Sequence, residues 1–249
     1  MKVRTLFKAL LVAGAVALNV PVSHAAEGNG GVLLGGTRLI FDGAKDAASM
    51  TVTNSAAKDV WLMRFWVSHY DNEANDGADD KQPLPFAVTP PLYRLDPKAA
   101  VQLRVNKLSD TLPVDRESVY YLNHLAIPPK KGERSYQKAV QSGLQFAVNT
   151  RIKLFYRPEA INDSSAVKAA PDKLVVTSTD KTMLLRNPTP YFINLSQLTV
   201  DEKPVQTGKD TMVAPFGELS LPATVAHGTL TYSTIDDRGM TTSVLKKQF

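Results

Sequence analysis

The chain has 249 residues, no cysteine and a formal net charge of +5, and these numbers exclude several classes of protein. Without cysteine there is no disulfide framework, so each core must hold by packing alone. Part of the charge lies in the first 25 residues, which carry Lys2, Arg4 and Lys8 of the 29 basic residues and none of the 24 acidic ones, so the remainder is only about +2. A nucleic-acid partner, which needs a clustered basic face, is not indicated.

Residues 1–25 have the pattern of an export signal. Basic residues precede the apolar stretch ALLVAGAVALNV, which is too short to span a bilayer, and Ser23 and Ala25 are small residues at the two positions that a signal peptidase recognises. We expect cleavage after Ala25, which leaves roughly 224 residues, enough for two domains of about 100–120 residues. No later segment predicts a transmembrane helix.

Short predicted strands follow one another along the first half, with almost no helical periodicity. Seven runs rich in Val, Thr, Leu and aromatic residues predict one immunoglobulin-like sandwich. In chain order the runs are 33–42, 47–54, 60–70, 86–97, 100–108, 118–128 and 144–158. Pro90 and Pro91 interrupt the fourth run. That run is therefore expected at a sheet border, either as a strand end or as an edge available to another chain.

The strand pattern restarts after Arg157 and Pro158, with weaker hydrophobicity. The linker RPEAINDSS contains a proline that blocks continuation of the strand. Seven further runs follow, at 173–179, 182–188, 191–200, 211–217, 218–223, 228–236 and 241–249. The sequence therefore predicts an all-β fold of two immunoglobulin-like β-sandwich domains, at 26–157 and 158–249.

Motifs of enzymes and metal sites are missing from the sequence. The three histidines after the signal segment lie far apart and have no metal-type or catalytic spacing: His69, His124 and His227. His69 and His124 could still converge on neighbouring strands, but separate packing or surface roles are favoured. The acidic segment DNEANDGADD fails as a calcium loop, because Asp76 and Gln82 stand where Gly and Glu are required. We predict no catalytic residue, no metal and no cofactor.

The run 144–158 carries an apolar row at alternate positions, namely Leu144, Phe146 and Val148. In an ordinary sandwich strand this row would face the core and the alternate residues would face water. A second interpretation is an exposed apolar row on a sheet edge, which would promote aggregation unless a partner covers it. Periodicity alone favours the first interpretation.

The same run carries cations that need partners, since an unpaired buried charge costs several kcal/mol. Arg157 could lie between Glu117 of the first domain and Asp237 of the second, and so clamp the domains at a fixed angle. Lys153 has no obvious carboxylate, which makes it available to an external anion, and Arg38 could converge on it.

Five segments together resemble a known family. They are TRLIFDG, TPPLYRLDP, LPVDRESVYYLNHLAIPP, TRIKLFYRP and NPTPYFINL, and the chain resembles the PapD-like periplasmic chaperones of chaperone–usher pilus assembly over essentially all of its mature length. His124 departs from the motif, which has an aliphatic residue at this position.

The resemblance implies a periplasmic chaperone with two sandwiches in an L or boomerang arrangement. It implies that Arg38 and Lys153 anchor the C-terminal carboxylate of a pilus subunit, and that Leu144, Phe146 and Val148 fill the groove left by the subunit's missing strand. Glu117, Arg157 and Asp237 match the interdomain ion network of the family. The implied partners are pilus subunits and an outer-membrane usher.

Two points stay open from the sequence alone. Lys153 has the opposite parity to the apolar row, so a bulge or twist between Asn149 and Ile152 would be needed to bring both to one face. The alternative function is a structural pilus subunit or adhesin, since such proteins are also exported, β-rich and free of catalytic motifs.

Overall fold

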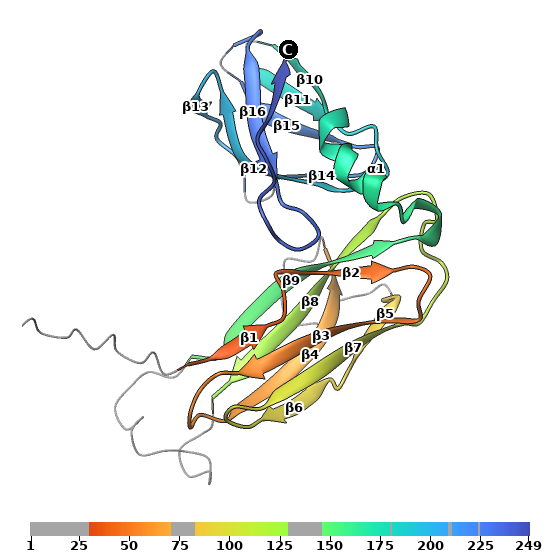
Figure 1. The fold of residues 1–249 in the computed structure, drawn as a ribbon, viewed down its shortest axis with the longest axis vertical. Coiled ribbons are helices and arrows are strands. Elements are labelled where there is room, and N and C mark those ends of the chain that lie inside the picture. The colour runs from red at the N-terminus through yellow and green to blue at the C-terminus, as the bar shows by residue number, and fades with distance from the viewer. Residues whose placement is uncertain (1–29, 71–82, 129–145, 180, 209–210, 224) are drawn as a thin grey trace, which may run out of the picture.

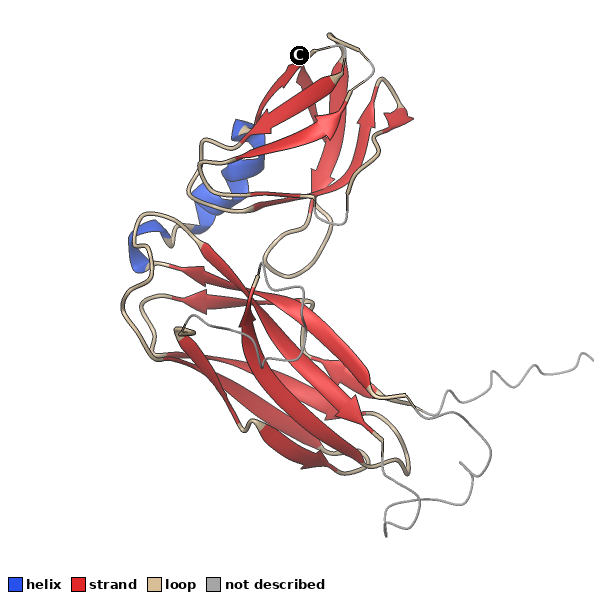
Figure 2. Cartoon of the chain, turned by 180° about the vertical axis from the view of Figure 1, so that it is seen from behind, coloured by secondary structure: helices blue, strands red, loops and turns tan. Residues whose placement is uncertain are grey.

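The computed structural model describes residues 30–70, 83–128, 146–179, 181–208, 211–223 and 225–249. They form two strand-rich domains that meet at an angle (Figure 1). Strands β1 to β9 build the first domain and β10 to β17 the second, and short helical segments lie beside the junction (Figure 2). The expected all-β fold of two sandwich domains in an angled arrangement is confirmed.

Two sheets form the first domain. Sheet A has the order β1-β3-β7-β5, and sheet B has the order β2-β9-β8-β4-β6. Sheet A contains β1 (Val32–Leu34), β3 (Ala47–Asn54), β5 (Phe86–Thr89) and β7 (Ala100–Lys107). Sheet B contains β2 (Arg38–Asp42), β4 (Trp61–His69), β6 (Leu92–Leu95), β8 (Ser118–Ile127) and β9 (Val148–Arg157). Paired strands are antiparallel except β2 and β9, which run parallel.

Alternation along the strands builds the core of the first domain. β7 buries Val101, Leu103 and Val105 and exposes the residues Ala100, Gln102 and Arg104 between them. Aromatic rings fill the space between the sheets, and the ring centroid of Phe86 lies 5.1 Å from that of Phe41. Burial of one large apolar side chain contributes about 1.5–3 kcal/mol, so packing alone can hold this domain.

Two of the expected strands each divide into two strands that belong to different sheets. The run 33–42 leaves sheet A after β1 and enters sheet B at β2. At this crossing the Gly35 N–H donates to the Thr51 carbonyl at 2.8 Å, and a Cβ on Gly35 would lie only 3.1 Å from that oxygen. The run 86–97 divides into β5 and β6, which end sheet A and sheet B respectively, with a cis Thr89–Pro90 bond between them. The two prolines therefore do lie at a sheet border.

The linker contains helical turns that the sequence pattern did not predict. A 3-10 turn, η2 (Glu159–Ile161), follows Pro158, and then come α1 (Ser164–Ala169) and η3 (Ala170–Lys173). Asp163 caps α1, because its Oδ1 accepts the N–H groups of Ser165 at 2.8 Å and Ala166 at 3.3 Å. A six-residue helix is too short to show a helical period, although the Asp cap was a usable signal.

Two smaller sheets form the second domain. One has the order β10-β11-β15, and the other has the order β13-β12-β16-β17 with β14 also paired to β12. Their strands are β10 (Val175–Ser178), β11 (Thr182–Arg186), β12 (Ile193–Val200), β13 (Lys203–Pro204), β14 (Met212–Val213), β15 (Glu218–Pro222), β16 (Thr229–Thr234) and β17 (Leu245–Gln248). Met183, Leu185 and Leu230 are fully buried between them. The Tyr232 hydroxyl donates to the Pro171 carbonyl at 2.7 Å, which ties η3 to this core.

Helices able to cross a membrane are not found among the described residues, since none is both long and apolar enough.

Candidate functional site

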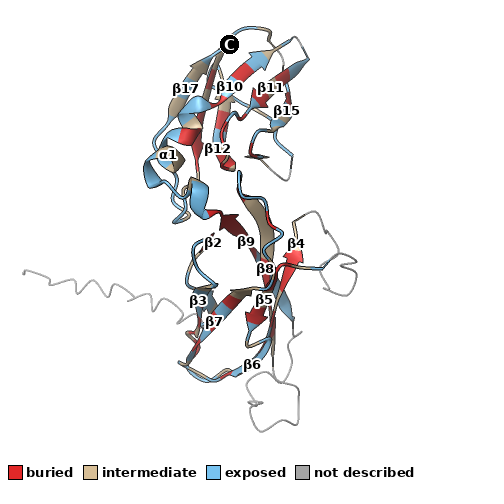
Figure 3. Cartoon of the chain, turned by 90° about the vertical axis from the view of Figure 1, so that its right-hand side faces the viewer, coloured by how far each residue is buried: buried red, intermediate tan, exposed pale blue. Residues whose placement is uncertain are grey.

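The first half of β9 is an open sheet edge. On one side β8 pairs with residues 148–156, from Ala126 opposite Val148 to Ser118 opposite Tyr156. On the other side β2 pairs only with residues 153–157. Within the described ranges, no strand pairs with the second side of residues 148–152. Burial along β9 accordingly rises toward the domain junction (Figure 3).

The apolar row stands at this open edge. Phe146 is 66% exposed and Val148 is 53% exposed, so the interpretation as core residues, which periodicity favoured, is wrong for both. Leu144, the third member of the predicted row, lies outside the described residues. Two large apolar side chains next to an unpaired backbone edge form a surface suited to strand addition.

The apolar row and Lys153 lie on opposite faces of sheet B. The ladder between β8 and β9 is unbroken, so it contains no bulge between Asn149 and Ile152 that would bring the row and Lys153 to one face. Val148 therefore shares a face with Ile152 and Leu154, which are buried in the core of the first domain, and Lys153 points outward. The physical reason is the continuous pairing with β8, which leaves no extra residue in the strand to invert the alternation.

Arg38 and Lys153 are direct partners in the parallel ladder between β2 and β9, so their side chains leave the sheet on the same outer face. Arg38 Nη1 donates to the Ile235 carbonyl of the second domain at 3.3 Å. Its Nε is buried and has no hydrogen-bond partner in the described part of the chain. Burial lowers the pKa of the Arg38 guanidinium, and the nearby Asp237 and Asp236 oppose that shift.

Lys153 also reaches the second domain. Its Nζ donates to Asn194 Oδ1 at 3.2 Å and lies 3.5 Å from Met212 Sδ. The same ammonium lies 5.5 Å from the ring centroid of Tyr70. All three of these groups are neutral.

Arg157 joins the two domains through two carboxylates. Its Nε donates to Glu117 Oε1 at 2.7 Å, while Nη1 and Nη2 donate to Asp237 Oδ2 and Oδ1 at 2.8 and 3.0 Å. Glu117 Oε2 in turn accepts the backbone N–H of Phe192 at 2.8 Å. Glu117 and Arg157 are 4% and 6% exposed, and this ion pair is therefore enclosed at the junction.

The electrostatics of this cluster follow from its burial. Burial alone would lower the pKa of Arg157, but its hydrogen bond to Asp237 and the charges of Glu117 and Asp237 raise it. Burial raises the pKa of Glu117, and the Arg157 charge and the Phe192 N–H oppose the rise. Removal of the guanidinium would leave a buried carboxylate without its counter-ion.

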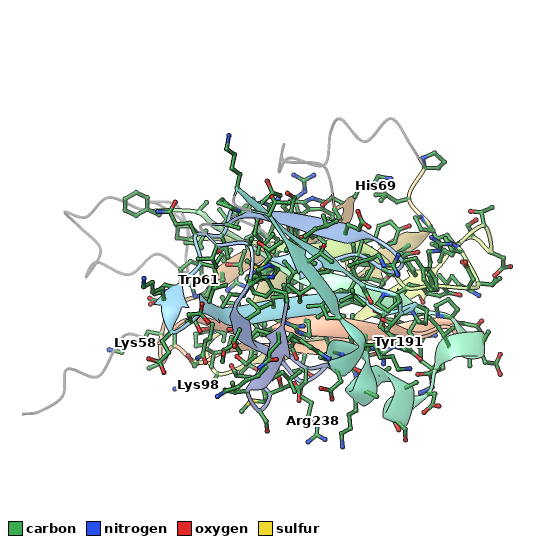
Figure 4. All side chains as sticks on the ribbon, turned by 90° about the horizontal axis from the view of Figure 1, so that it is seen from above. Lys58, Trp61, His69, Lys98, Tyr191 and Arg238 are labelled. Atoms are coloured by element: carbon green, nitrogen blue, oxygen red, sulfur yellow. The ribbon has the colours of Figure 1, made fainter. Side chains whose placement is uncertain are left out.

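Further contacts lie beside this ion pair at the junction. The Glu117 N–H donates to the Pro190 carbonyl at 2.9 Å, and the Arg116 guanidinium stacks 5.0 Å from the ring centroid of Phe216. Tyr191 donates to the Ile161 carbonyl at 2.7 Å. A cavity of about 390 Å³ lies at the junction, between Arg38 and Arg157 on one side and Lys168 of α1 on the other. Figure 4 labels Tyr191 and Arg238, two further residues that line this cavity.

The two histidines of sheet B do not converge. His124 pairs with Phe65 in the middle of the ladder between β4 and β8, whereas His69 pairs with Tyr120 at its end. Among the described residues, no cluster of three or more His, Cys, Asp or Glu side chains could hold a metal ion. His124 is 6% exposed, neither ring nitrogen has a partner in the described part, and burial lowers its pKa. The candidate calcium segment at 71–80 lies outside the described residues.

Sequence reasoning missed the groups of the second domain that contact the two cations. Asn194 lies inside the quoted segment NPTPYFINL, and Ile235 lies at the end of a predicted strand, but nothing local to either residue signals a contact. Lys153 and Asn194 are 41 positions apart in the sequence, and Arg38 and Ile235 are 197 positions apart. Co-variation between positions 153 and 194 would be the signal to look for.

Two family models match the chain. One, described as pili and flagellar-assembly chaperone, PapD N-terminal domain, matches residues 31–162, and the other, pili assembly chaperone PapD, C-terminal domain, matches residues 169–245. The probable fimbrial chaperone LpfB of Escherichia coli O157:H7 is 38% identical over 221 residues, which are 88% of each chain. The chaperone FimB/FhaD of Bordetella pertussis is 34% identical over 243 residues, or 95% of this chain and 93% of that one.

Solved structures agree with these matches. The Escherichia coli chaperone DraB has a TM-score of 0.71 and 30% identity, over 88% of this chain and 99% of its own. The SafB chaperone of Salmonella enterica, solved in complex with the SafA pilin, has a TM-score of 0.71 and 28% identity, over 88% of this chain and 97% of its own.

Proposed function

The chain belongs to the PapD family of pilus-assembly chaperones, and we propose that it captures a pilus subunit by donating the open edge of β9. The protein is a fimbrial chaperone, and the role of its family is assembly rather than catalysis. The related SafB is solved with a pilin bound, which supports pilus subunits as the partner. The alternative, a pilus subunit or adhesin, loses support because chaperone models match both domains.

The single observation that carries this proposal is the exposed apolar edge at residues 146–152. A subunit that lacks one strand exposes a hydrophobic groove and unpaired backbone groups, and would otherwise aggregate. The free backbone of β9 can hydrogen-bond to such a groove, while Phe146 and Val148 occupy its pockets. Leu144 would occupy a third pocket.

The opposite placement of the row and the cations is compatible with this mode of binding. A subunit strand beside β9 lies in the plane of sheet B, so its alternate side chains meet the core face and the outer face in turn. Its C-terminal carboxylate can then turn to the outer face where β2 begins. There we propose that Arg38 and Lys153 bind it with charge-assisted hydrogen bonds.

The remaining parts of the proposal concern geometry and location. The ion cluster of Arg157, Glu117 and Asp237 would fix the angle between domains 26–157 and 158–249, so that the anchor and the donor edge face one subunit. Residues 1–25 would direct export to the periplasm, where the loaded chaperone would deliver its subunit to an outer-membrane usher.

The substitution Phe146→Glu tests the donor edge. If this residue stands on an exposed edge, the variant folds as the wild type does and captures no subunit, because a carboxylate cannot enter an apolar pocket. Circular dichroism and a subunit pull-down from periplasm measure the two properties. A folded variant with normal subunit recovery would rule out donation by this edge, and an unfolded one would place Phe146 in the core.

A further inference from the structure

A loop of the second domain reaches the point where β2 begins. It consists of residues 235–241, in the dark blue segment between β16 and β17 (Figure 1), and we call it the junction loop. Its Ile235 carbonyl accepts Arg38 Nη1 at 3.3 Å. Its Gly239 lies so close to Thr37 that a Cβ added to the glycine would stand 2.1 Å from Thr37 Oγ1. The junction loop therefore contacts two consecutive residues of the first domain, one of which is the anchor cation Arg38.

The same loop carries the carboxylate that binds Arg157. Asp237 accepts Nη1 and Nη2 of that guanidinium at 2.8 and 3.0 Å. Arg157 stands four positions beyond the ladder partner of Arg38, so both side chains leave sheet B on its outer face. The conformation of one loop thus determines where the second domain meets both guanidinium groups.

Asp236 gives the junction loop its shape. Its Oδ1 accepts the backbone N–H groups of Arg238 at 3.0 Å and of Met240 at 2.8 Å. Its backbone closes the same turn, because its N–H donates to the Met240 carbonyl and its carbonyl accepts the Gly239 N–H, each at 2.9 Å. An aspartate that accepts N–H groups farther along the chain holds a turn in one conformation.

The base of the junction loop is fixed to the second domain. The Ile235 N–H donates to the Asn194 carbonyl at 2.9 Å, and Ile235 pairs with Thr241 in an isolated β-bridge. Arg38 meets the carbonyl of this fixed residue, and its Cζ lies 5.9 Å from the ring centroid of Phe155 in its own domain. Each domain therefore contributes a contact that orients the Arg38 guanidinium.

We propose that Asp236 is a positioning residue of the carboxylate anchor, which orients the Arg38 guanidinium by fixing the conformation of the junction loop. This inference rests on the proposed role of Arg38 in binding the C-terminal carboxylate of a subunit. It adds that the second domain sets the geometry of the anchor, through the loop that also binds Arg157.

An electrostatic role of Asp236 is the alternative, since its charge opposes the lowering of the Arg38 pKa. The substitution Asp236→Asn separates the two roles, because an amide Oδ1 accepts the same two N–H groups without carrying the charge. Positioning predicts that Asp236→Asn keeps the anchor and that Asp236→Ala weakens it. An electrostatic role predicts that both variants weaken it equally.

The test uses the two-domain protein and two synthetic peptides of the same alternating apolar sequence, one ending in a free carboxylate and the other in a carboxamide. For the wild type we expect about tenfold or greater preference for the carboxylate peptide, measured by calorimetry. Asp236→Ala should lower this preference several-fold, whereas Asp236→Asn should stay within about twofold of the wild type. Affinity for the carboxamide peptide should not change in either variant, because the open edge of β9 is not altered.

Two further variants complete the design. Gly239→Ala disturbs the junction loop without changing a charge, because φ at this position is +81° and the added Cβ would meet Thr37. It should also lower the preference several-fold, and it serves if Asp236→Ala does not fold. The matched control is Asp201→Ala, which removes an aspartate that accepts the Thr229 N–H at 3.0 Å just beyond the far end of β12. This control should keep the wild-type preference.

The outcomes distinguish this inference from the function on which it rests. If Arg38→Ala loses the carboxylate preference but Asp236→Ala and Gly239→Ala keep it, Asp236 has no positioning role and the anchor stands. The inference is also overturned if the loop variants lose affinity for both peptides equally, or if Asp236→Asn loses as much preference as Asp236→Ala. If the wild type has no preference, or Arg38→Ala keeps it, the anchor itself is wrong and this inference fails with it.

Discussion

The two halves of β9 have the same strand geometry and opposite surroundings. Residues 153–157 pair with β2, and all of them except Arg157 also pair with β8, and they are mostly buried. Within the described part of the chain, residues 148–152 pair with β8 alone, and they are mostly exposed. The alternation of side chains continues unbroken from one half to the other. What differs is the neighbour, because β2 begins at Arg38 and leaves the earlier residues uncovered. The sequence of a strand can therefore predict that its backbone is extended. Whether the edge of that strand is covered or exposed depends on where the neighbouring strand begins.

Among the substitutions that test this difference between the two halves of β9, we expect the largest effect from removing the charge of Arg157 at the buried end. Arg157→Ala leaves Glu117 without its counter-ion in a site that is 4% exposed, and should lower the free energy of unfolding by about 3–5 kcal/mol. Small-angle scattering should also show a wider distribution of domain angles.

The matched control is Arg151→Ala, in the exposed half of the same strand. Arg151 is exposed and lies 4.5 Å from the ring centroid of Tyr121, and contacts of an exposed cation contribute little, so its loss should cost at most about 1 kcal/mol. Equal melting temperatures and equal scattering for the two variants would contradict the clamp.

Removal of the anchor cations should change capture rather than stability. If Arg38 and Lys153 anchor the subunit carboxylate as proposed, Arg38→Ala and Lys153→Ala each delete a charge-assisted contact worth about 2–5 kcal/mol. The double variant should melt near the wild-type temperature and recover no subunit from periplasm. Normal recovery would mean that neither cation is needed to bind the subunit.

The substitutions Leu154→Ala and Val148→Ala test the two halves of β9 on the same face of sheet B. Leu154 is fully buried, so its truncation should lower the free energy of unfolding by about 2–5 kcal/mol. Val148 is 53% exposed, so its truncation should change stability by no more than about 0.5 kcal/mol while it weakens subunit binding. Chemical denaturation measures both, and similar losses would show that the exposed half belongs to the core.

The smallest expected effect concerns His124, which faces the core opposite Thr150 of the open half. Burial lowers the pKa of His124, so below about pH 6.5, the ordinary value, the unfolded chain binds a proton that the folded chain refuses. Stability is therefore complete above that pH and falls as the pH drops toward the lowered value.

His124→Leu should remove this loss and raise stability by about 1 kcal/mol at neutral pH, because a buried unsatisfied group disappears. Denaturant unfolding between pH 7.5 and 5 measures the slope. His227→Gln, at an exposed position, should keep the wild-type slope. If the stability of His124→Leu still falls steeply with decreasing pH, the pH dependence comes from another group.

Local pattern explains most of the fold and about half of the site. Alternating apolar residues identified the strands, and Phe146 and Val148 were recognisable as a row because their spacing is local. The division of run 33–42 between two sheets was not predictable, because the crossing at Gly35 depends on a contact with Thr51 in another strand. The contact of Lys153 with Asn194 was also not predictable, since it joins residues of two different domains. Whether a bulge brings the row and Lys153 to one face was left open by the sequence, because the register against β8 exists only in the assembled sheet.

The unbroken ladder of β9 gives the site a fixed spacing as well as two faces. Val148 lies five positions before Lys153, about 17 Å along the strand at roughly 3.3 Å per residue. One residue inserted between them would turn Phe146 and Val148 to the outer face. Two inserted residues would restore their face but move both about 7 Å farther from the cations. If the proposed capture is right, a subunit held at its C-terminus would then meet the wrong side chain in each pocket, and the length of this segment would itself contribute to recognition.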